Sequence, residues 1–273
     1  MELHNHKNRY PFRIAAPSFI YPSDYITNAR RLAPYLDEVE LLFFESSPSS
    51  LPSPGEVEAL RALQEKMHIS YNLHLPLDLD LCVEDPDSRD AAAASFSRVF
   101  DLVGPLSATT YTLHLPMKDI DAADGSQTLE IWQNRAMRGL DALFNRVNLP
   151  PRKISVETLN YPPAWLGPVV KGMDLSVCVD IGHVVRYGFD LNAVFNQFHS
   201  RIAICHLHGV ADGEDHLALQ HMDAAHLRTV KQFLSSFTGT VSLEVFSSQK
   251  LSESMQALAT LMQEEGPPDE RKL

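Results

Sequence analysis

Eight short apolar runs with strand-like composition recur along the chain, and amphipathic stretches with helical spacing separate them. Most of the runs are nearly continuous in Val, Ile, Leu and Phe, which is typical of parallel strands buried on both faces. The alternation of such strands with helices predicts an α/β fold built on a parallel sheet. The predicted strands are Phe12–Ala16, Val39–Phe44, Ile69–Leu75, Tyr111–Leu115, Ile154–Thr158, Leu175–Asp180, Ile202–Leu207 and Val241–Phe246.

The stretches between these strands predict the helices. Asp24, Asp190 and Asp223 stand where helix N-caps are expected. Pro162 and Pro163 predict a shorter helix after the fifth strand. The other predicted helices cover Tyr25–Leu36, Val57–Met67, Ala91–Val103, Leu129–Val147, Leu191–Phe198, Ala224–Phe237 and Leu251–Glu264.

The length of the chain favours a closed barrel. Eight strand–helix units in 273 residues match the size of a (β/α)8 (TIM) barrel. We therefore expect a single TIM-barrel domain over residues 1–273, with the barrel at about 10–265 and short tails at both ends. A doubly wound open sheet is the alternative, but no GxGxxG follows the first strand, so its dinucleotide-binding version has no support.

Charge and cysteine content exclude several classes of protein. The net charge of −12 disfavours nucleic acid as a partner, because phosphate backbones repel an acidic surface. Cys82, Cys178 and Cys205 match no zinc-knuckle spacing and are expected to be reduced thiols. The N-terminus has no signal-peptide pattern, and no apolar run reaches membrane-spanning length. These features predict a cytoplasmic protein without a membrane partner and leave its oligomeric state open.

Histidines and carboxylates follow six consecutive strands. Active-site groups of a parallel barrel lie where its strands end, at the carboxyl face. The predicted strands three to eight end with His74, His114, Glu157, Asp180 with His183, His206 with His208, and Glu244.

This placement predicts a metal site. A single strand-end histidine is more often a hydrogen-bonded core residue, and a single glutamate often pairs with Arg or Lys. Together, however, Glu157, Asp180 and Glu244 would repel one another at the mouth of the barrel unless cations neutralised them. Mixed histidine and carboxylate ligands suit divalent zinc, manganese or iron.

Further candidates follow the second and seventh strands. Glu214 and His216, in the segment DGEDHLAL, could grip a metal from one side, although a solvated turn is the simpler interpretation. His208 lies two residues past His206, on the same strand face, and is expected to line the substrate pocket. His221 and Glu45 are candidate substrate contacts, and Glu45 could instead be a salt-bridged carboxylate at the rim.

The ordered set of strand-end residues resembles the xylose-isomerase-like TIM barrels, a superfamily of sugar isomerases and epimerases and of AP endonucleases of the endonuclease IV type. The resemblance spans nearly the whole chain. It is carried by Glu157 in SVETL, Asp180 and His183 in VDIGH, His206 in CHLHG, and Glu244 in SLEVF.

The resemblance implies two metal counts. The isomerases and epimerases hold one metal, which here implies Glu157, Asp180, His206 and Glu244 as ligands. The endonuclease IV type holds three metals, although this chain has Glu214 where an Asp is usual. The implied ligand groups are His74, His114 and Glu157 for the first metal, Glu157, Asp180, His206 and Glu244 for the second, and His183, Glu214 and His216 for the third.

The motifs LHLP, HLHG, DHLAL and LEVF narrow the resemblance to cobamide-remodelling phosphodiesterases, which cleave the phosphoribosyl linkage in the nucleotide loop of corrinoids. The expected function is therefore metal-dependent hydrolysis of a small phosphorylated metabolite, with Glu157 and Glu244 as catalytic residues and two or three divalent ions as cofactors. One alternative is a single-metal sugar isomerase or epimerase in which Glu157 and Glu244 exchange a substrate proton. Another is a barrel that binds a metal or a corrinoid without turnover.

Overall fold

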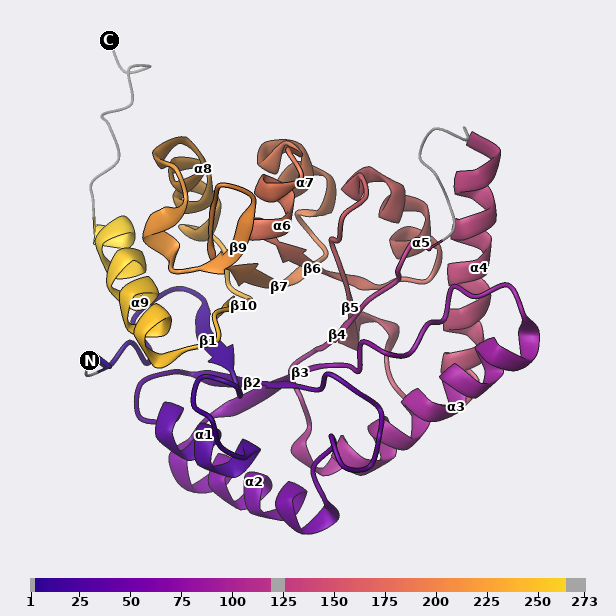
Figure 1. Ribbon diagram of the computed structural model, residues 1–273, viewed down its shortest axis with the longest axis horizontal. Coiled ribbons are helices and arrows are strands. Elements are labelled where there is room, and N and C mark those ends of the chain that lie inside the picture. The colour runs from indigo at the N-terminus through magenta and orange to yellow at the C-terminus, as the bar shows by residue number, and fades with distance from the viewer. Residues whose placement is uncertain (1–2, 119–125, 264–273) are drawn as a thin grey trace.

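Eight parallel strands close a barrel at the centre of the molecule (Figure 1). The computed structural model describes residues 3–118 and 126–263. Around the barrel the strands follow the order β1-β10-β7-β6-β5-β4-β3-β2, which confirms the predicted (β/α)8 barrel. The parallel pairing expected across the third, fourth and fifth strands is also confirmed. The barrel strands are β1 (Arg13–Pro17), β2 (Glu38–Leu42), β3 (Ser70–His74), β4 (Tyr111–Leu113), β5 (Ile154–Glu157), β6 (Ser176–Asp180), β7 (Ile202–Leu207) and β10 (Thr240–Leu243).

Helices surround the barrel on its outside (Figure 1). The carboxylates of Asp24, Asp190 and Asp223 each accept a backbone N–H bond at the start of a helix, as predicted. No helix of the described residues is long and apolar enough to cross a membrane. The helices are α1 (Tyr25–Leu32), α2 (Pro54–Met67), α3 (Pro86–Val103), α4 (Ser126–Phe144), α5 (Gly167–Gly172), α6 (Ile181–Arg186), α7 (Leu191–Phe198), α8 (Ala224–Leu234) and α9 (Ser248–Gln263).

Several helix ends differ from the prediction. Helix α2 starts three residues early because Ser53 and Glu56 form a capping box ahead of its first apolar residue. Helix α3 starts at Pro86 because Asp85 caps it. After β5, a 3-10 turn over Pro163–Leu166 leads into the six-residue α5, as the two prolines predicted. Residues 264–273, where we expect the C-terminal tail, lie outside the described residues.

The inner face of the barrel is more polar than the near-continuous apolar runs predicted. Strand β2 alternates Glu38 and Glu40 with Val39 and Leu41, and all four are fully buried. Glu38 accepts a hydrogen bond from Thr240, two strands away in the barrel, so its carboxylate lies inside the barrel. Apolar side chains therefore pack outward against the helices, and polar ones bond to each other across the interior.

A short antiparallel hairpin follows β7 and was not predicted. Its strands are β8 (Gly209–Ala211) and β9 (Glu214–Leu217). Asp212 and Gly213 form the two-residue turn with φ of +52° and +80°. Asp-Gly is the preferred sequence of such a turn, so the signal was present in the sequence. The pairing is irregular between Gly209 and Ala211.

Candidate metal centre

The carboxyl face of the barrel brings together the predicted ligands of strands three to eight. His74, Glu157 and Asp180 are the last residues of β3, β5 and β6, and all three are buried. His206 lies within β7, and Glu244 follows β10 directly. His114 follows the last residue of β4 and is part-exposed. Because parallel strands end at one face, residues up to 170 positions apart, such as His74 and Glu244, meet there.

The first group of donor atoms consists of His74, His114 and Glu157. The Nε2 atoms of His74 and His114 lie 3.0 Å and 2.9 Å from the same oxygen, Oε2 of Glu157. The ligand atoms of all three residues lie within 4.8 Å of one another. These are the three residues that the resemblance implied as ligands of a first metal, and the structure brings them together.

The second group surrounds Nδ1 of His206. This nitrogen lies 3.3 Å from Oε2 of Glu244, 3.6 Å from Oε1 of Glu157 and 3.9 Å from Oδ2 of Asp180. Glu157 thus directs one oxygen at each group. Nδ1 of His206, Oδ2 of Asp180 and Oε2 of Glu244 are all buried and have no hydrogen-bond partner among the described atoms. Buried polar atoms are normally satisfied, so three unsatisfied atoms that converge on one point fit a cation site.

The histidines are oriented as metal ligands. A carbonyl oxygen only accepts hydrogen bonds, so Nδ1 of His74 donates to Leu75 O (3.0 Å) and Nδ1 of His216 donates to Glu244 O (3.0 Å). In the neutral form of each ring, Nε2 would carry the lone pair that a metal needs; Nε2 of His74 faces Oε2 of Glu157 at 3.0 Å. This pattern, in which one ring nitrogen is anchored and the other is left free, is usual for metal-binding histidines.

Glu40 anchors one ring nitrogen of His206 and was not among the predicted site residues. Its carboxylate accepts hydrogen bonds from Nε2 of His206 at 3.0 Å and from the hydroxyl of Ser242 at 2.5 Å. Nε2 of His206 therefore carries a proton, and Nδ1 faces the carboxylates of the second group. A glutamate inside a buried strand is the sequence signal for this role, and the apolar character of the predicted strand obscured it.

The third group contains His208 in place of Glu214. The ligand atoms of His183, His208 and His216 lie within 4.8 Å of one another. Nδ1 of His208 accepts a hydrogen bond from the backbone N–H of His216 (3.0 Å). The same nitrogen also lies 3.3 Å from the carbonyl oxygen of Gly209. Nε2 of His208 lies 3.2 Å from Oδ1 of Asp180 and is buried without a hydrogen-bond partner among the described atoms. The three imidazoles of His183, His208 and His216 therefore form this group together.

Three predicted site residues lie away from the centre. The side chain of Glu214 is exposed beside the hairpin turn and belongs to none of the ligand groups found among the described residues. Its neighbour Asp215 pairs with Arg186. His221 is exposed at the end of a 3-10 turn. Glu45 is exposed just beyond β2, where it accepts a hydrogen bond from the hydroxyl of Ser50 at 3.2 Å.

The neighbouring imidazoles keep the buried carboxylates ionised. Burial by itself would raise the pKa of Glu157, but His114 and His206 hold it well below its ordinary value. Burial opposes ionisation of Asp180 as well, and His183 and His208 lower its pKa on balance. The pKa of Glu244 is lowered by His206 against the same effect of burial. Protonated imidazoles thus balance the carboxylates here, as divalent cations would at higher pH.

Comparison with known proteins supports the fold. Residues 30–264 match the family described as xylose isomerase-like TIM barrel. A D-tagatose 3-epimerase-like protein is 16% identical, with a TM-score of 0.77 over 92% of this chain and 97% of its own. Endonuclease IV from Thermus thermophilus is 18% identical, with a TM-score of 0.68 over 93% of this chain and 100% of its own. The zinc-containing structure of the IolI protein is 14% identical, with a TM-score of 0.69 over 92% and 98%. No curated protein matches the sequence.

Proposed function

The chain belongs to the xylose isomerase-like TIM barrel family, and from this we propose that it is a divalent-metal-dependent phosphodiesterase acting on a small phosphorylated metabolite. Members of this superfamily include epimerases and endonuclease IV, so membership by itself leaves the reaction class open. The finer proposal is that the substrate is a corrinoid and that the scissile bond is the phosphoribosyl linkage of its nucleotide loop.

One observation carries the proposal. Glu157 directs Oε2 at His74 and His114, and it directs Oε1 at Nδ1 of His206. A carboxylate placed between two donor groups is suited to bridge two metals. A one-metal epimerase site needs only the second group and gives His74 and His114 no role. The residues therefore suit chemistry that uses at least two cations.

The residues of the centre have different roles in the proposed reaction. Divalent metals, when bound at these groups, would activate water and neutralise negative charge on a phosphodiester. Glu157 and Glu244 would act as ligands of these metals, and Glu40 fixes the ring of His206. His183 and His216 offer donors on the side of the β8–β9 hairpin, where a leaving oxygen would be stabilised. No Ser or Cys nucleophile is required.

The test is a substrate panel with dialysed protein reconstituted with zinc, manganese or iron(II). We expect phosphoester cleavage of a cobalamin-type corrinoid and much less turnover of simple sugar phosphates. Glu244→Gln preserves shape but removes a charge, so it should abolish most turnover while the protein keeps its unfolding midpoint. His216→Ala should slow cleavage while the first two groups keep their metals.

A sugar epimerase is the second candidate, and the completeness of the second group favours it. Glu157, Asp180, His206 and Glu244 form a donor set even without His74 and His114. In that case one ion binds per chain, and His74→Ala and His114→Ala leave the metal content unchanged. Epimer or aldose–ketose interconversion, without phosphoester cleavage under any of the three metals, would replace the proposed function with this one.

A further inference from the structure

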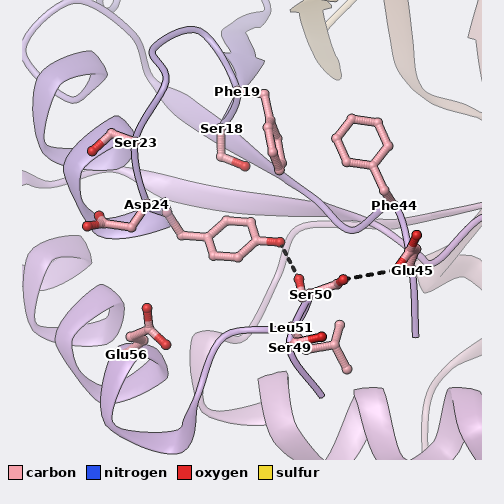
Figure 2. A pocket seen from close by; sticks show the side chains of 11 residues that line it. Ser18, Phe19, Ser23, Asp24, Phe44, Glu45, Ser49, Ser50, Leu51 and Glu56 are labelled. Atoms are coloured by element: carbon pink, nitrogen blue, oxygen red, sulfur yellow. Dashed lines mark hydrogen bonds between the residues drawn. The ribbon is translucent and has the colours of Figure 1, made fainter. Parts of the chain in front are cut away.

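A hollow opens at the carboxyl face of the barrel, where β1 and β2 end. It is a pocket of about 520 Å³ between the segments that follow β1 and β2 (Figure 2). We propose that this pocket binds a planar aromatic group that carries N–H donors and a neutral or positive charge. The inference that this aromatic group is part of the substrate rests on the proposed function. The inference about which groups the pocket prefers does not depend on it.

Aromatic rings form one wall of the pocket. Figure 2 shows Phe19 and Phe44 next to each other, and their ring centroids lie 4.7 Å apart at 71°. Phe19 also meets the ring of Tyr25 edge-on, with centroids 5.9 Å apart. The Tyr25 hydroxyl is held by Ser50 O at 2.7 Å. Phe44 is nevertheless 41% exposed, which is unusual for so large an apolar side chain. This pair therefore offers aromatic surface to a flat ligand.

The polar lining of the pocket is acidic. Asp24, Glu45 and Glu56 line it together with serines, and none of the described lining residues carries a positive charge. Glu45 has only the hydroxyl of Ser50 as a partner for Oε2 among the described groups. Acceptors of this kind suit a ligand with N–H donors, and the aromatic faces next to them favour a cation over an anion.

The helix ends in the pocket do not change this preference. Helices α1 and α2 both begin there, and a free helix N-terminus attracts anions. Each carries a carboxylate at its start: Asp24 accepts the N–H of Thr27 at 2.6 Å, and in the capping box of α2 the Ser53 hydroxyl accepts the N–H of Glu56 at 3.3 Å while Glu56 accepts the N–H of Ser53 at 2.8 Å. A phosphate or carboxylate would therefore meet a carboxylate at each helix start, and an anionic occupant is disfavoured.

The pocket adjoins the metal centre through the backbone. The N–H of Phe43 donates to the carbonyl of His74 at 3.0 Å, and the N–H of Leu77 donates to the carbonyl of Phe44 at 3.2 Å. Phe44 and Glu45 thus leave β2 directly beside the end of β3, which carries a predicted ligand. One molecule could therefore place a phosphodiester at the metals and a nitrogen-bearing ring in the pocket, which makes a nucleotide-like substrate the class that fits both sites.

Three probes of nearly equal shape test the selectivity. Benzamidine, benzamide and benzoate share one ring and carry positive, zero and negative charge. Titrations of the metal-loaded protein, followed by ligand-observed NMR, should rank their affinities in that order. Phe44→Ala should weaken benzamidine about twofold to fivefold through loss of ring contact. Glu45→Gln should weaken benzamidine by a similar factor, about twofold to fivefold, and leave benzamide unchanged.

Ile131→Ala is the matched control, because Ile131 is 43% exposed and lies on α4. It should change none of the three affinities. Equal or tighter binding of benzoate, or benzamidine binding that Phe44→Ala does not weaken, would overturn the proposal. Absence of binding by all three probes would overturn it too. These titrations need no turnover, so they test the pocket independently of the enzyme reaction. If the protein cleaves a phosphodiester but the probes bind in a different order of affinity, only the assignment of the pocket is rejected. If the probes bind in the expected order but no phosphodiester is cleaved, only the link between the pocket and the proposed function is rejected.

Discussion

Both ends of the barrel interior carry buried carboxylates, but only at one end is the carboxylate fully hydrogen-bonded. At the amino-terminal end, the carboxylate of Glu38 accepts four hydrogen bonds and is fully buried. Its donors are Arg13, Ser70, Asn72 and Thr240. At the carboxyl end, single atoms of Asp180, His206 and Glu244 lie buried without a partner among the described residues.

The difference separates a structural network from a binding site. Carboxylates occur at both ends, so their presence in the interior does not by itself indicate chemistry. What distinguishes the carboxyl end is that the carboxylates of Glu157, Asp180 and Glu244 converge on one nitrogen, Nδ1 of His206. The amino-terminal network stabilises the closed barrel on its own, whereas the carboxyl end needs either protons or metal ions to do so.

The largest effect is expected from Glu157→Ala. Because Glu157 serves both the first and the second group, the variant should lose metal from both, and turnover should fall by more than the roughly 100-fold that loss of an outer ligand partner causes. His74→Ala should weaken mainly one group. Elemental analysis of reconstituted protein measures both. Retention of two ions by Glu157→Ala would remove the bridging role.

Glu38→Ala should have the largest effect on stability. It leaves the donors of Arg13, Ser70, Asn72 and Thr240 without their acceptor inside the barrel, which should lower the free energy of unfolding by about 3–5 kcal/mol. Urea denaturation measures this loss. Glu58→Ala is the matched control, because Glu58 pairs with Arg61 on the outside of α2. If Glu38→Ala empties the metal groups without changing stability, the division between the two ends is wrong.

Glu40→Gln should give a smaller loss of metal affinity, roughly 10–100-fold. The amide keeps the size of the side chain, but it weakens the acceptor that holds Nε2 of His206 and orients Nδ1. Metal competition with a chromogenic chelator reports the change. An unaltered affinity would mean that packing, rather than Glu40, orients the ring.

The smallest expected effect is a loss of thermal stability at alkaline pH, and it should appear only in metal-free protein. Burial opposes the charged form of His74, yet Glu157 raises its pKa above 6.5, while the pKa of Glu157 lies below 4.5. The stability due to Glu157 is present above 4.5 and is lost as pH falls through its lowered pKa. The stability due to His74 is present below 6.5 and is lost as pH rises through its raised pKa.

Metal-free protein should therefore unfold at a lower temperature at about pH 9 than at about pH 6, because its imidazoles lose their protons. Protein loaded with metal should lack this decline, since the cations replace those protons. Thermal unfolding with and without a chelator makes the comparison. An equal decline in both forms would show that the imidazoles of this centre do not govern it.

The sequence predicted the barrel and most of the centre for one physical reason. Strands of a parallel barrel end at one face, so residues such as His74 and Glu244 could be placed together without knowing any contact. Glu38 and Glu40 were missed because the apolar residues of β2 dominate its pattern, although its residues alternate with period two.

The hairpin limited what could be predicted around the third group. The spacing of Glu214 and His216 suggested a pair of metal ligands, but the direction in which side chains of a loop point depends on the conformation of its backbone. The turn at Asp212 and Gly213 leaves Glu214 exposed, and the positive φ of His216 (48°) accompanies the bond from its ring to Glu244 O. His208 could be placed on the right face of β7, but its contact with the backbone N–H of His216 depends on how the hairpin folds back.

The cross-barrel bonds also set an order of events during synthesis on the ribosome. Glu38 bonds to Thr240 and Glu40 bonds to Ser242, each over a separation of 202 residues. A nascent chain that has released β1 through β9 already carries all the histidines of the centre, but it still lacks Glu244, and Glu38 and Glu40 still lack these partners. The first group, on the neighbouring strands β3, β4 and β5, is by then already present, whereas the second group is incomplete. Completion of the second group is therefore a late event, and its occupancy signals that the first and last strands of the barrel have met.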